Sequence, residues 1–309
     1  MGKYIVRRLL WMVVVLFFVS LITFLLFFLG SSNPAKAIAG THATPEVLAR
    51  INRTLGLDRP IYVQYGKYLW ALVHGDLGYS YVTQQPVGAS IMQRFPATLL
   101  VALWGIFFEL VIGIPIGMIS ALKQYSVRDR AFTVFSLLGI AAPSFWLGFI
   151  FLYAFAFKIP IFPLGGYEGW LHPLYGVLPG LVLGLGGAAW YSRMLRSSML
   201  DILGADYVKA ARAKGLPERT VVWRHIMRNA VSPIVTLLGM DFGWFLGGVL
   251  VIEIVFSIPG IGQQAWNAIQ TQDRPMIMGT VLFGALLVTV SNLVVDIVYT
   301  WLDPRVKYN

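Results

Sequence analysis

The sequence contains no cysteine among its 309 residues and has few charged side chains. The lack of cysteine excludes disulfides and thiolate metal sites. Charged residues make up 12% of the chain, against ~25% in soluble domains, whereas hydrophobic residues make up 57% and the mean hydropathy is +0.71. This composition predicts a protein that is largely solvated by a lipid bilayer.

Motifs for nucleotide binding and for hydrolysis are also missing. No G-x-x-x-x-G-K-[ST] phosphate loop occurs, so the chain is not expected to bind ATP itself, and no H-E-x-x-H occurs. The four histidines, all outside the centres of the apolar runs, are His42, His74, His172 and His225. We therefore predict no catalytic residue, no cofactor and no metal site in this chain, and an intramembrane enzyme has little support.

Six apolar runs each approach the ~20 residues that a helix needs to cross ~30 Å of hydrocarbon. They lie at about 9–29, 97–122, 131–157, 173–191, 234–256 and 278–301. The first run is too long for the apolar region of a signal peptide, although Ala35, Ala37 and Ala39 form a cleavage-like pattern. The runs predict an all-α polytopic membrane protein with six transmembrane helices.

The basic residues predict the orientation of these helices. With a cytoplasmic N-terminus, the inner segments hold most of the 24 Lys and Arg residues. Both termini are therefore predicted to be cytoplasmic. Topology and anionic membrane lipid explain the formal charge of +10, so no nucleic-acid partner is expected.

The chain is predicted to have four parts. These are an N-terminal transmembrane helix (1–29), an extracytoplasmic helical segment (30–95), a transmembrane domain with five helices (96–303) and a cytoplasmic tail (304–309). In the second part, Thr44 and Pro45 predict the start of a helix and Gly56 its end, and Pro60 precedes a second helix. This segment either only covers the spans or also receives substrate.

Small residues recur at every fourth position in two of the apolar runs. They are Gly176, Gly180, Gly184 and Ala188 in the fourth run and Gly239, Gly243 and Gly247 in the fifth. Such ridges let helices approach closely. Close packing and sliding of the helices past one another are both compatible with the pattern.

Four acidic residues fall inside the predicted spans: Glu109, Asp241, Glu253 and Asp296. A charge at the bilayer centre costs about 2.5 to 3.5 kcal/mol, so each needs a partner or a watery path. Glu253 and Asp296 lie near helix ends, where we predict structural capping. Glu109 and Asp241 lie deeper and are candidates either for structural hydrogen bonding or for the transport pathway.

The longest inner loop, between the fourth and fifth runs, contains a predicted helix pair. Asp206 is expected to cap a helix of about 207–214, Gly215 to close it with positive φ, and Pro217 to open the next helix.

One side of this helix carries only Ala210 and Ala211, so a partner surface can approach it, and Lys209, Arg212 and Lys214 surround the contact. The spacing of Ala211, Gly215 and Val221 also fits a DNA-binding helix-turn-helix. That interpretation is disfavoured because the adjacent spans leave no independent core to present a recognition helix.

The stretch Lys209–Gly215 up to Pro233 resembles the EAA loop of ABC importer permeases, with Lys209 where the general pattern has Glu. The length from Gly215 to Pro233 is similar to that in the dipeptide, oligopeptide and nickel branch of these permeases. Further segments that resemble this branch are Gly56–Tyr65, Gly75–Gly78, Phe95–Thr98, Pro143–Trp146, Glu253–Gly262 and Asp303–Arg305. The resemblance covers the chain from end to end.

The resemblance implies an inner-membrane permease subunit that forms the pathway for di- or oligopeptides. It also implies a heterodimer with a second permease, two ATP-binding subunits that hold ATP and Mg, and an extracytoplasmic substrate-binding protein. The coupling helix that docks on the ATPase would comprise Asp206, Tyr207, Lys209, Ala210, Ala211, Arg212, Lys214, Gly215 and Leu216. A permease for nickel or a metal chelate, and a secondary transporter that uses Glu109 and Asp241, remain alternatives.

Overall fold

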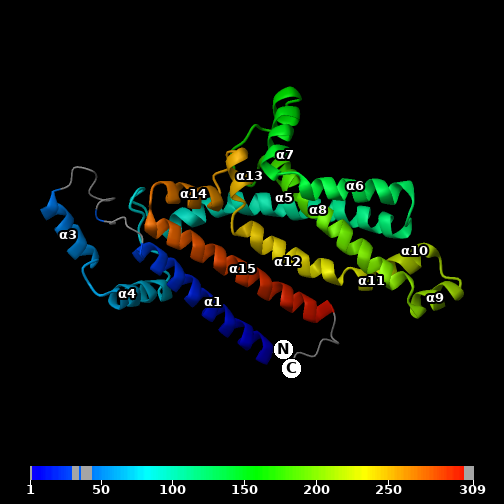
Figure 1. Ribbon diagram of the computed structural model, residues 1–309, viewed down its shortest axis with the longest axis horizontal. Helices are drawn as coiled ribbons and strands as arrows, with labels where there is room; N and C mark the ends of the chain where they lie inside the picture. The colour runs from blue at the N-terminus through cyan, green and yellow to red at the C-terminus, as the bar shows by residue number, and fades with distance from the viewer. Residues whose placement is uncertain (1, 30–34, 36–43, 303–309) are drawn as a thin grey trace.

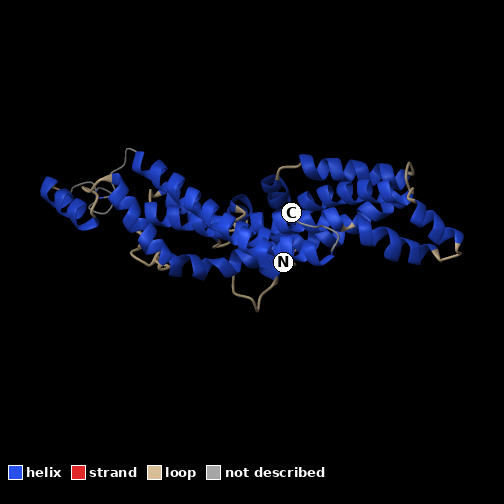
Figure 2. Cartoon of the chain, turned by 90° about the horizontal axis from the view of Figure 1, so that it is seen from below, coloured by secondary structure: helices blue, strands red, loops and turns tan. Residues whose placement is uncertain are grey.

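The computed structural model describes residues 2–29, 35 and 44–302, which form helices and loops and no β-strand (Figure 2). The molecule is elongated, with helix α3 at one end and helix α9 at the other (Figure 1). We call these the α3 end and the α9 end. Predictions for His42, for Asp303–Arg305 and for the tail 304–309 lie outside the described residues.

The helices follow one another as the apolar pattern predicts, with additional breaks. The first half contains α1 (Gly2–Leu29), α3 (Pro45–Leu55), α4 (Ile61–Val73), α5 (Val87–Leu122), α6 (Val127–Ala141), α7 (Ser144–Phe151), the wider π-helical segment η1 (Leu152–Lys158) and α8 (Leu174–Leu203). The second half contains α9 (Asp206–Ala213), α10 (Glu218–Thr220), η2 (Val221–Ile226), α11 (Met227–Ala230), α12 (Ser232–Leu246), α13 (Leu250–Val255), α14 (Ile261–Gln270) and α15 (Arg274–Leu302).

Four described helices are long and apolar enough to cross a membrane: α1, α5, α8 and α15. The number rises to six if each of two bent helix pairs is one span. The prediction of one continuous helix over 131–157 is wrong, because α6 and α7 meet at a bend of 102°. Pro143 stands at the bend, where its missing N–H and its restriction of Ala142 to extended backbone stop an α-helix.

The fifth predicted run, 234–256, is also interrupted. Helix α12 ends at Leu246, and α13 begins only at Leu250. Gly248 between them has φ of +104°, a conformation that a residue with a side chain rarely adopts. Residues 232–255 therefore form two helices instead of the one that hydropathy predicts.

Helices α5 and α8 pack along the small-residue ridge predicted in the fourth run. A Cβ added at Gly184 would lie 2.7 Å from the carbonyl oxygen of Gly105, and one at Gly117 would lie 2.7 Å from that of Ser192. Gly180 likewise lies directly against Trp104. Close packing by this ridge is confirmed, and α5 contributes glycines of its own that the sequence reading did not single out.

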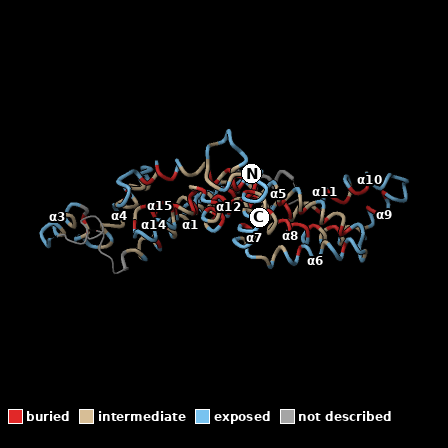
Figure 3. Tube along the Cα trace, turned by 90° about the horizontal axis from the view of Figure 1, so that it is seen from above, coloured by how far each residue is buried: buried red, intermediate tan, exposed pale blue. Residues whose placement is uncertain are grey.

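Helix α12 packs in the same way against α15. A Cβ at Gly243 would lie 3.1 Å from the Cβ of Ser291, and Gly239 faces Val295 at still closer range. The buried residues accordingly follow the centre of the helical bundle along its length, while its outer surface is exposed (Figure 3). Much of that outer surface is apolar, as expected for a protein in lipid.

The two helices at the α3 end agree with the sequence prediction. The hydroxyl of Thr44 accepts a hydrogen bond from the Val47 N–H at 3.4 Å, and Gly56 ends α3 in the left-handed conformation. Helix α4 then lies against α1, where the hydroxyls of Tyr65 and Ser20 are 3.0 Å apart. The segment is therefore attached to the first long helix.

Candidate functional site at the α9 end

Residues 206–216, called here the α9 segment, form an eight-residue helix and a turn at the end of the molecule opposite α3 (Figure 1). Ala205 occupies the N-cap position, so the prediction that Asp206 caps the helix is wrong. Asp206 lies in the first turn instead, where the positive end of the helix dipole stabilises its carboxylate. The carboxylate also forms an ion pair with the Lys209 ammonium group at 3.2 Å. Both side chains are exposed, so this pair adds little stability.

One face of α9 is buried inside the protein. Val208 is fully buried and Ala211 is 5% exposed, and both pack in a cluster with Val221, Val222 and Ile226 of the following segment. The expectation that Ala211 forms an open face for a partner is therefore corrected. Its small side chain instead lets α9 pack closely on η2 of the same chain.

The opposite face of α9 is exposed to solvent and carries six of the predicted contact residues. They are Asp206, Tyr207, Lys209, Ala210, Arg212 and Lys214. Leu216 follows the turn and is 37% exposed, and Tyr207 is 45% exposed. The combination of apolar, small and basic side chains suits a protein surface that carries acidic groups.

The turn after α9 has the predicted geometry. Gly215 has φ of +75° and no neighbouring atom that an added Cβ would meet, so backbone conformation alone selects glycine there. Arg212 reaches across the turn and donates to Glu218 through Nη2 at 2.6 Å and Nε at 3.1 Å. Hydrogen bonding to Glu218 raises the pKa of Arg212, which therefore stays charged.

Two contacts of the α9 segment were missed by sequence reasoning. Glu218 closes the turn, and the Asn229 side-chain amide donates to the Tyr207 hydroxyl at 3.0 Å. The opposite charges of Arg212 and Glu218 on either side of a predicted turn were a usable signal. The Tyr207–Asn229 contact has no such signal, because it depends on how α11 folds back.

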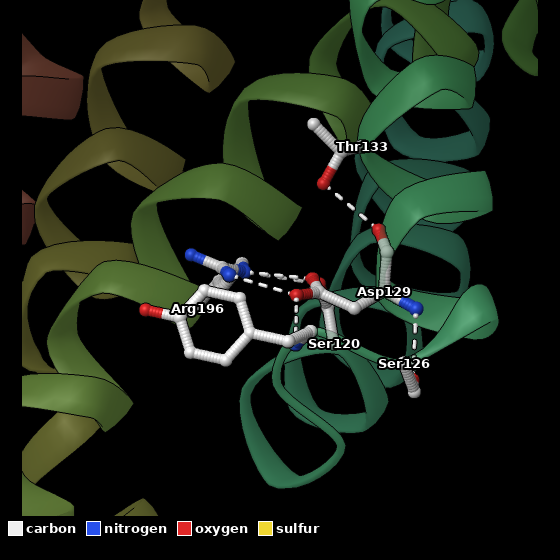
Figure 4. A network of polar contacts seen from close by, with 6 residues as sticks. Ser120, Ser126, Asp129, Thr133 and Arg196 are labelled. Carbon is white, nitrogen blue, oxygen red and sulfur yellow. Dashed lines mark hydrogen bonds and ion pairs between the residues drawn. The ribbon is translucent and has the colours of Figure 1, made fainter.

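A partly buried ion pair joins α6 to α8 (Figure 4). Arg196 of α8 donates to the two carboxylate oxygens of Asp129 in α6, each at 2.9 Å. The Ser120 hydroxyl of α5 donates to the same carboxylate, and the Tyr125 N–H donates to it at 2.9 Å. Asp129 is 4% exposed, and it thereby links α5, α6 and α8. Sequence reasoning did not single out this cluster.

The two candidate pathway acids lie deeper in the bundle. Glu109 of α5 is 1% exposed and lies directly against Gly187 of α8, with no hydrogen-bond partner for Oε2 among the described residues. Asp241 of α12 is partly buried. The structure thus encloses Glu109 between two helices of the same chain, and its role in transport stays a prediction.

Glu253 and Asp296 differ from each other. Glu253 is fully buried, and its carboxylate accepts hydrogen bonds from Thr98 at 2.7 Å and from the Gln263 N–H at 2.7 Å. This agrees with the predicted structural role at a helix end. Asp296 instead forms an ion pair with Arg8 at 2.9 Å, which joins α15 to α1.

Long apolar helices, a bundle closed by glycine ridges and a short exposed helix at one end define a multi-pass membrane protein with a surface for a further subunit. The chain belongs to the family of binding-protein-dependent transport system inner membrane components, which matches residues 113–308. The family of N-terminal regions of the same membrane components matches residues 1–102.

Curated relatives match the chain over its whole length. A putative peptide transport system permease protein of Brucella abortus (strain 2308) is 39% identical, with all of both chains covered. The glutathione transport system permease protein GsiC of Escherichia coli (strain K12) is 36% identical, again with full coverage of both chains.

A solved structure shows a similar fold. The structure is that of the MetNI methionine ABC transporter in inward-facing conformations, and the match has a TM-score of 0.56 at 18% identity. It covers 69% of this chain and 96% of the other. The fold is therefore that of an ABC importer permease, and the chain is a multi-pass component of the inner membrane.

Proposed function

We propose that the chain forms, with a second permease subunit, the pathway through which an ABC importer moves di- or oligopeptides across the inner membrane. The observation that carries this proposal is the exposed face of the α9 segment at the tip of the bundle, in a chain of this transport family. The full-length relatives named for peptide and glutathione transport support the substrate class.

In this proposal two ATP-binding subunits hold ATP and Mg and dock on the α9 segment from the cytoplasm. Both chain termini are cytoplasmic, and the α3 end faces outward, where a substrate-binding protein delivers peptides. The segment α7–η1 supports the heterodimer, because it projects from the bundle and carries exposed aromatic side chains such as Phe149 and Phe157 (Figure 1). A second permease covers such a surface, with membrane lipid around the remainder.

Transport of nickel or a metal chelate is the alternative within the same class. Among the described residues no group of three or more His, Cys, Asp or Glu side chains is arranged to hold a metal ion. A chelate recognised by its organic part needs no such group, so the substrate-binding protein decides between peptide and chelate.

The test is uptake by the complete complex, purified with its co-expressed subunits and reconstituted in proteoliposomes. We expect accumulation of a radiolabelled di- or oligopeptide that requires ATP inside the vesicle together with the substrate-binding protein. Uptake of nickel but not of peptide would establish the alternative substrate. Uptake by this chain alone under a proton gradient would establish a secondary transporter and contradict the proposal.

A further inference from the structure

An open cavity of about 390 Å³ lies at the α3 end, between α1, α4, the loop of residues 76–81 and the start of α15. Its volume is in the range of sites that bind small molecules. Aromatic and apolar side chains from all four segments line it, among them Phe24, Phe27, Tyr68, Tyr79, Tyr81 and Met278. The α9 segment is at the opposite end of the molecule, so this cavity is separate from the predicted ATPase contact.

Tyr68 of α4 supplies a polar group in this apolar lining. Its hydroxyl is buried and has no hydrogen-bond partner among the described residues, while its ring stacks on Phe24 with centroids 5.9 Å apart. Burial raises the pKa of Tyr68, so the hydroxyl remains a donor at neutral pH. A buried donor without a partner is destabilising, so a rotation of the Tyr68 side chain that brings its hydroxyl to an acceptor of a ligand in the cavity is favoured.

The walls of the cavity are fixed by hydrogen bonds. Asp273, which is 2% exposed, accepts from the Ser80 hydroxyl and from the Tyr81 N–H at 3.2 Å. The carboxylate of Asp76 accepts from the Gly78 N–H at 2.8 Å. The loop 76–81 is thereby attached to the start of α15, so its part of the aromatic lining is formed before any ligand arrives.

Both signs of charge lie in the lining. Asp76 contributes a carboxylate and Arg274 a guanidinium. A ligand with an ammonium group, a carboxylate and an apolar body matches these features, whereas the hydrocarbon tail of a lipid offers no acceptor for a hydroxyl.

We propose that this cavity binds a short zwitterionic peptide by an aromatic or branched apolar side chain, with the Tyr68 hydroxyl donating to a peptide carbonyl oxygen. The proposal rests on the function proposed above and adds a binding site at the α3 end that recognises the side chain of the peptide. The cavity would then favour peptides with an apolar residue over peptides of glycine alone.

The experiment uses the complete transporter in lipid nanodiscs and the photoreactive dipeptide glycyl-p-benzoylphenylalanine as probe. We expect crosslinks that mass spectrometry assigns to cavity residues such as Met278. Tyr68→Phe should weaken probe binding about threefold to tenfold, the value of one hydrogen bond. Ala71→Trp, which fills the cavity, should abolish the crosslinks.

Matched controls come from the same helix. Tyr62→Phe makes the same chemical change at a position that is 74% exposed, and Val73→Trp adds an indole at one that is 81% exposed. Both should leave crosslinking and binding unchanged. Membrane levels of each variant show whether the chain still folds.

Three outcomes would overturn the inference. They are crosslinks confined to other residues, crosslinks that persist in Ala71→Trp, and displacement of the probe by dihexanoylphosphatidylcholine but not by glycyl-phenylalanine, which would identify a lipid site. ATP-driven peptide uptake is measured in the same preparation. Uptake without cavity crosslinks contradicts only this inference, whereas cavity crosslinks without uptake contradict only the proposed transport function.

Discussion

Ala210 and Ala211 are adjacent in sequence but lie on different faces of α9. Ala210 is exposed, whereas Ala211 is 5% exposed and packs against η2. The two small side chains therefore have different effects: Ala210 leaves the outer surface of α9 flat, and Ala211 lets α9 pack closely on the segment that follows it.

We expect Ala210→Trp to leave the permease folded but to weaken its association with the ATP-binding subunits, because the indole projects from the proposed contact face. Ala211→Trp should overpack the interior, which lowers the free energy of unfolding by about 1 to 3 kcal/mol and reduces the amount of folded protein. Pull-down of the ATP-binding subunits, normalised to permease level, separates the two effects. Full association of Ala210→Trp would show that this face does not contact the ATPase.

Gly215 provides a second test at the scale of one residue. Gly215→Ala forces a residue with a Cβ into the left-handed backbone conformation, which costs about 1 to 2 kcal/mol of stability. No neighbouring atom obstructs the added Cβ, so the backbone strain is the only cost. Gly204→Ala is the matched control, since Gly204 also has open space around it but has φ of −85°.

We expect the first variant to reduce substrate-stimulated ATP hydrolysis in the reconstituted complex and the second to retain it. Equal activity of both variants would mean that the geometry of this turn does not matter for coupling.

At the scale of helices, hydropathy predicts the long elements well and their interruptions poorly. α1, α8 and α15 cover the runs predicted at 9–29, 173–191 and 278–301, and α5 starts at Val87, before its apolar run. The breaks at Pro143 and Gly248 depend on single residues inside runs that stay apolar throughout.

Side-chain partners are harder to predict than helices, because hydropathy contains no information on contacts across the bundle. Glu253 has the predicted structural role, but only its bond from the Gln263 N–H is local, whereas its other partner, Thr98, lies on α5. The ion pair of Asp129 with Arg196 joins residues far apart in sequence, and nothing in the local pattern of either helix indicates it.

That ion pair gives a prediction for the element scale. Asp129→Ala leaves the partly buried Arg196 without its carboxylate, which should destabilise the contact of α6 with α8 by about 1 to 3 kcal/mol. Limited proteolysis of the purified complex should then cleave near residues 123–127, before α6. Asp206→Ala is the control, because it removes a carboxylate from an exposed ion pair within one helix. This variant should leave the proteolytic pattern unchanged.

The helices α3 and α4 form a unit that can be removed as a whole. Replacing residues 44–74 by a flexible bridge should leave α1 inserted, because the Ser20 hydroxyl also donates to the Phe17 carbonyl at 2.7 Å and needs no partner from α4. We expect normal membrane levels and impaired uptake at low peptide concentration, where delivery by the substrate-binding protein limits the rate. Normal uptake at low concentration would show that the unit only covers the spans.

For the molecule as a whole, the absence of cysteine allows a direct test of orientation. Single cysteines at Trp70, on α4, and at Lys214, on the α9 segment, occupy exposed positions at opposite ends. We expect a membrane-impermeant maleimide to label Trp70→Cys from outside intact cells, and to label Lys214→Cys only after the inner membrane is opened. The reverse pattern would invert the proposed topology.

The ion pair between Arg8 and Asp296 has a consequence for biosynthesis. It joins α1 to α15, two helices that lie side by side although almost the whole chain separates these residues (Figure 1). A ribosome must translate past codon 296 before this contact can form. Until then α1 lies in lipid without its partner helix α15. The closing of the bundle is therefore a late event that follows insertion of α1. We expect quality-control proteases to degrade nascent chains that are arrested before α15.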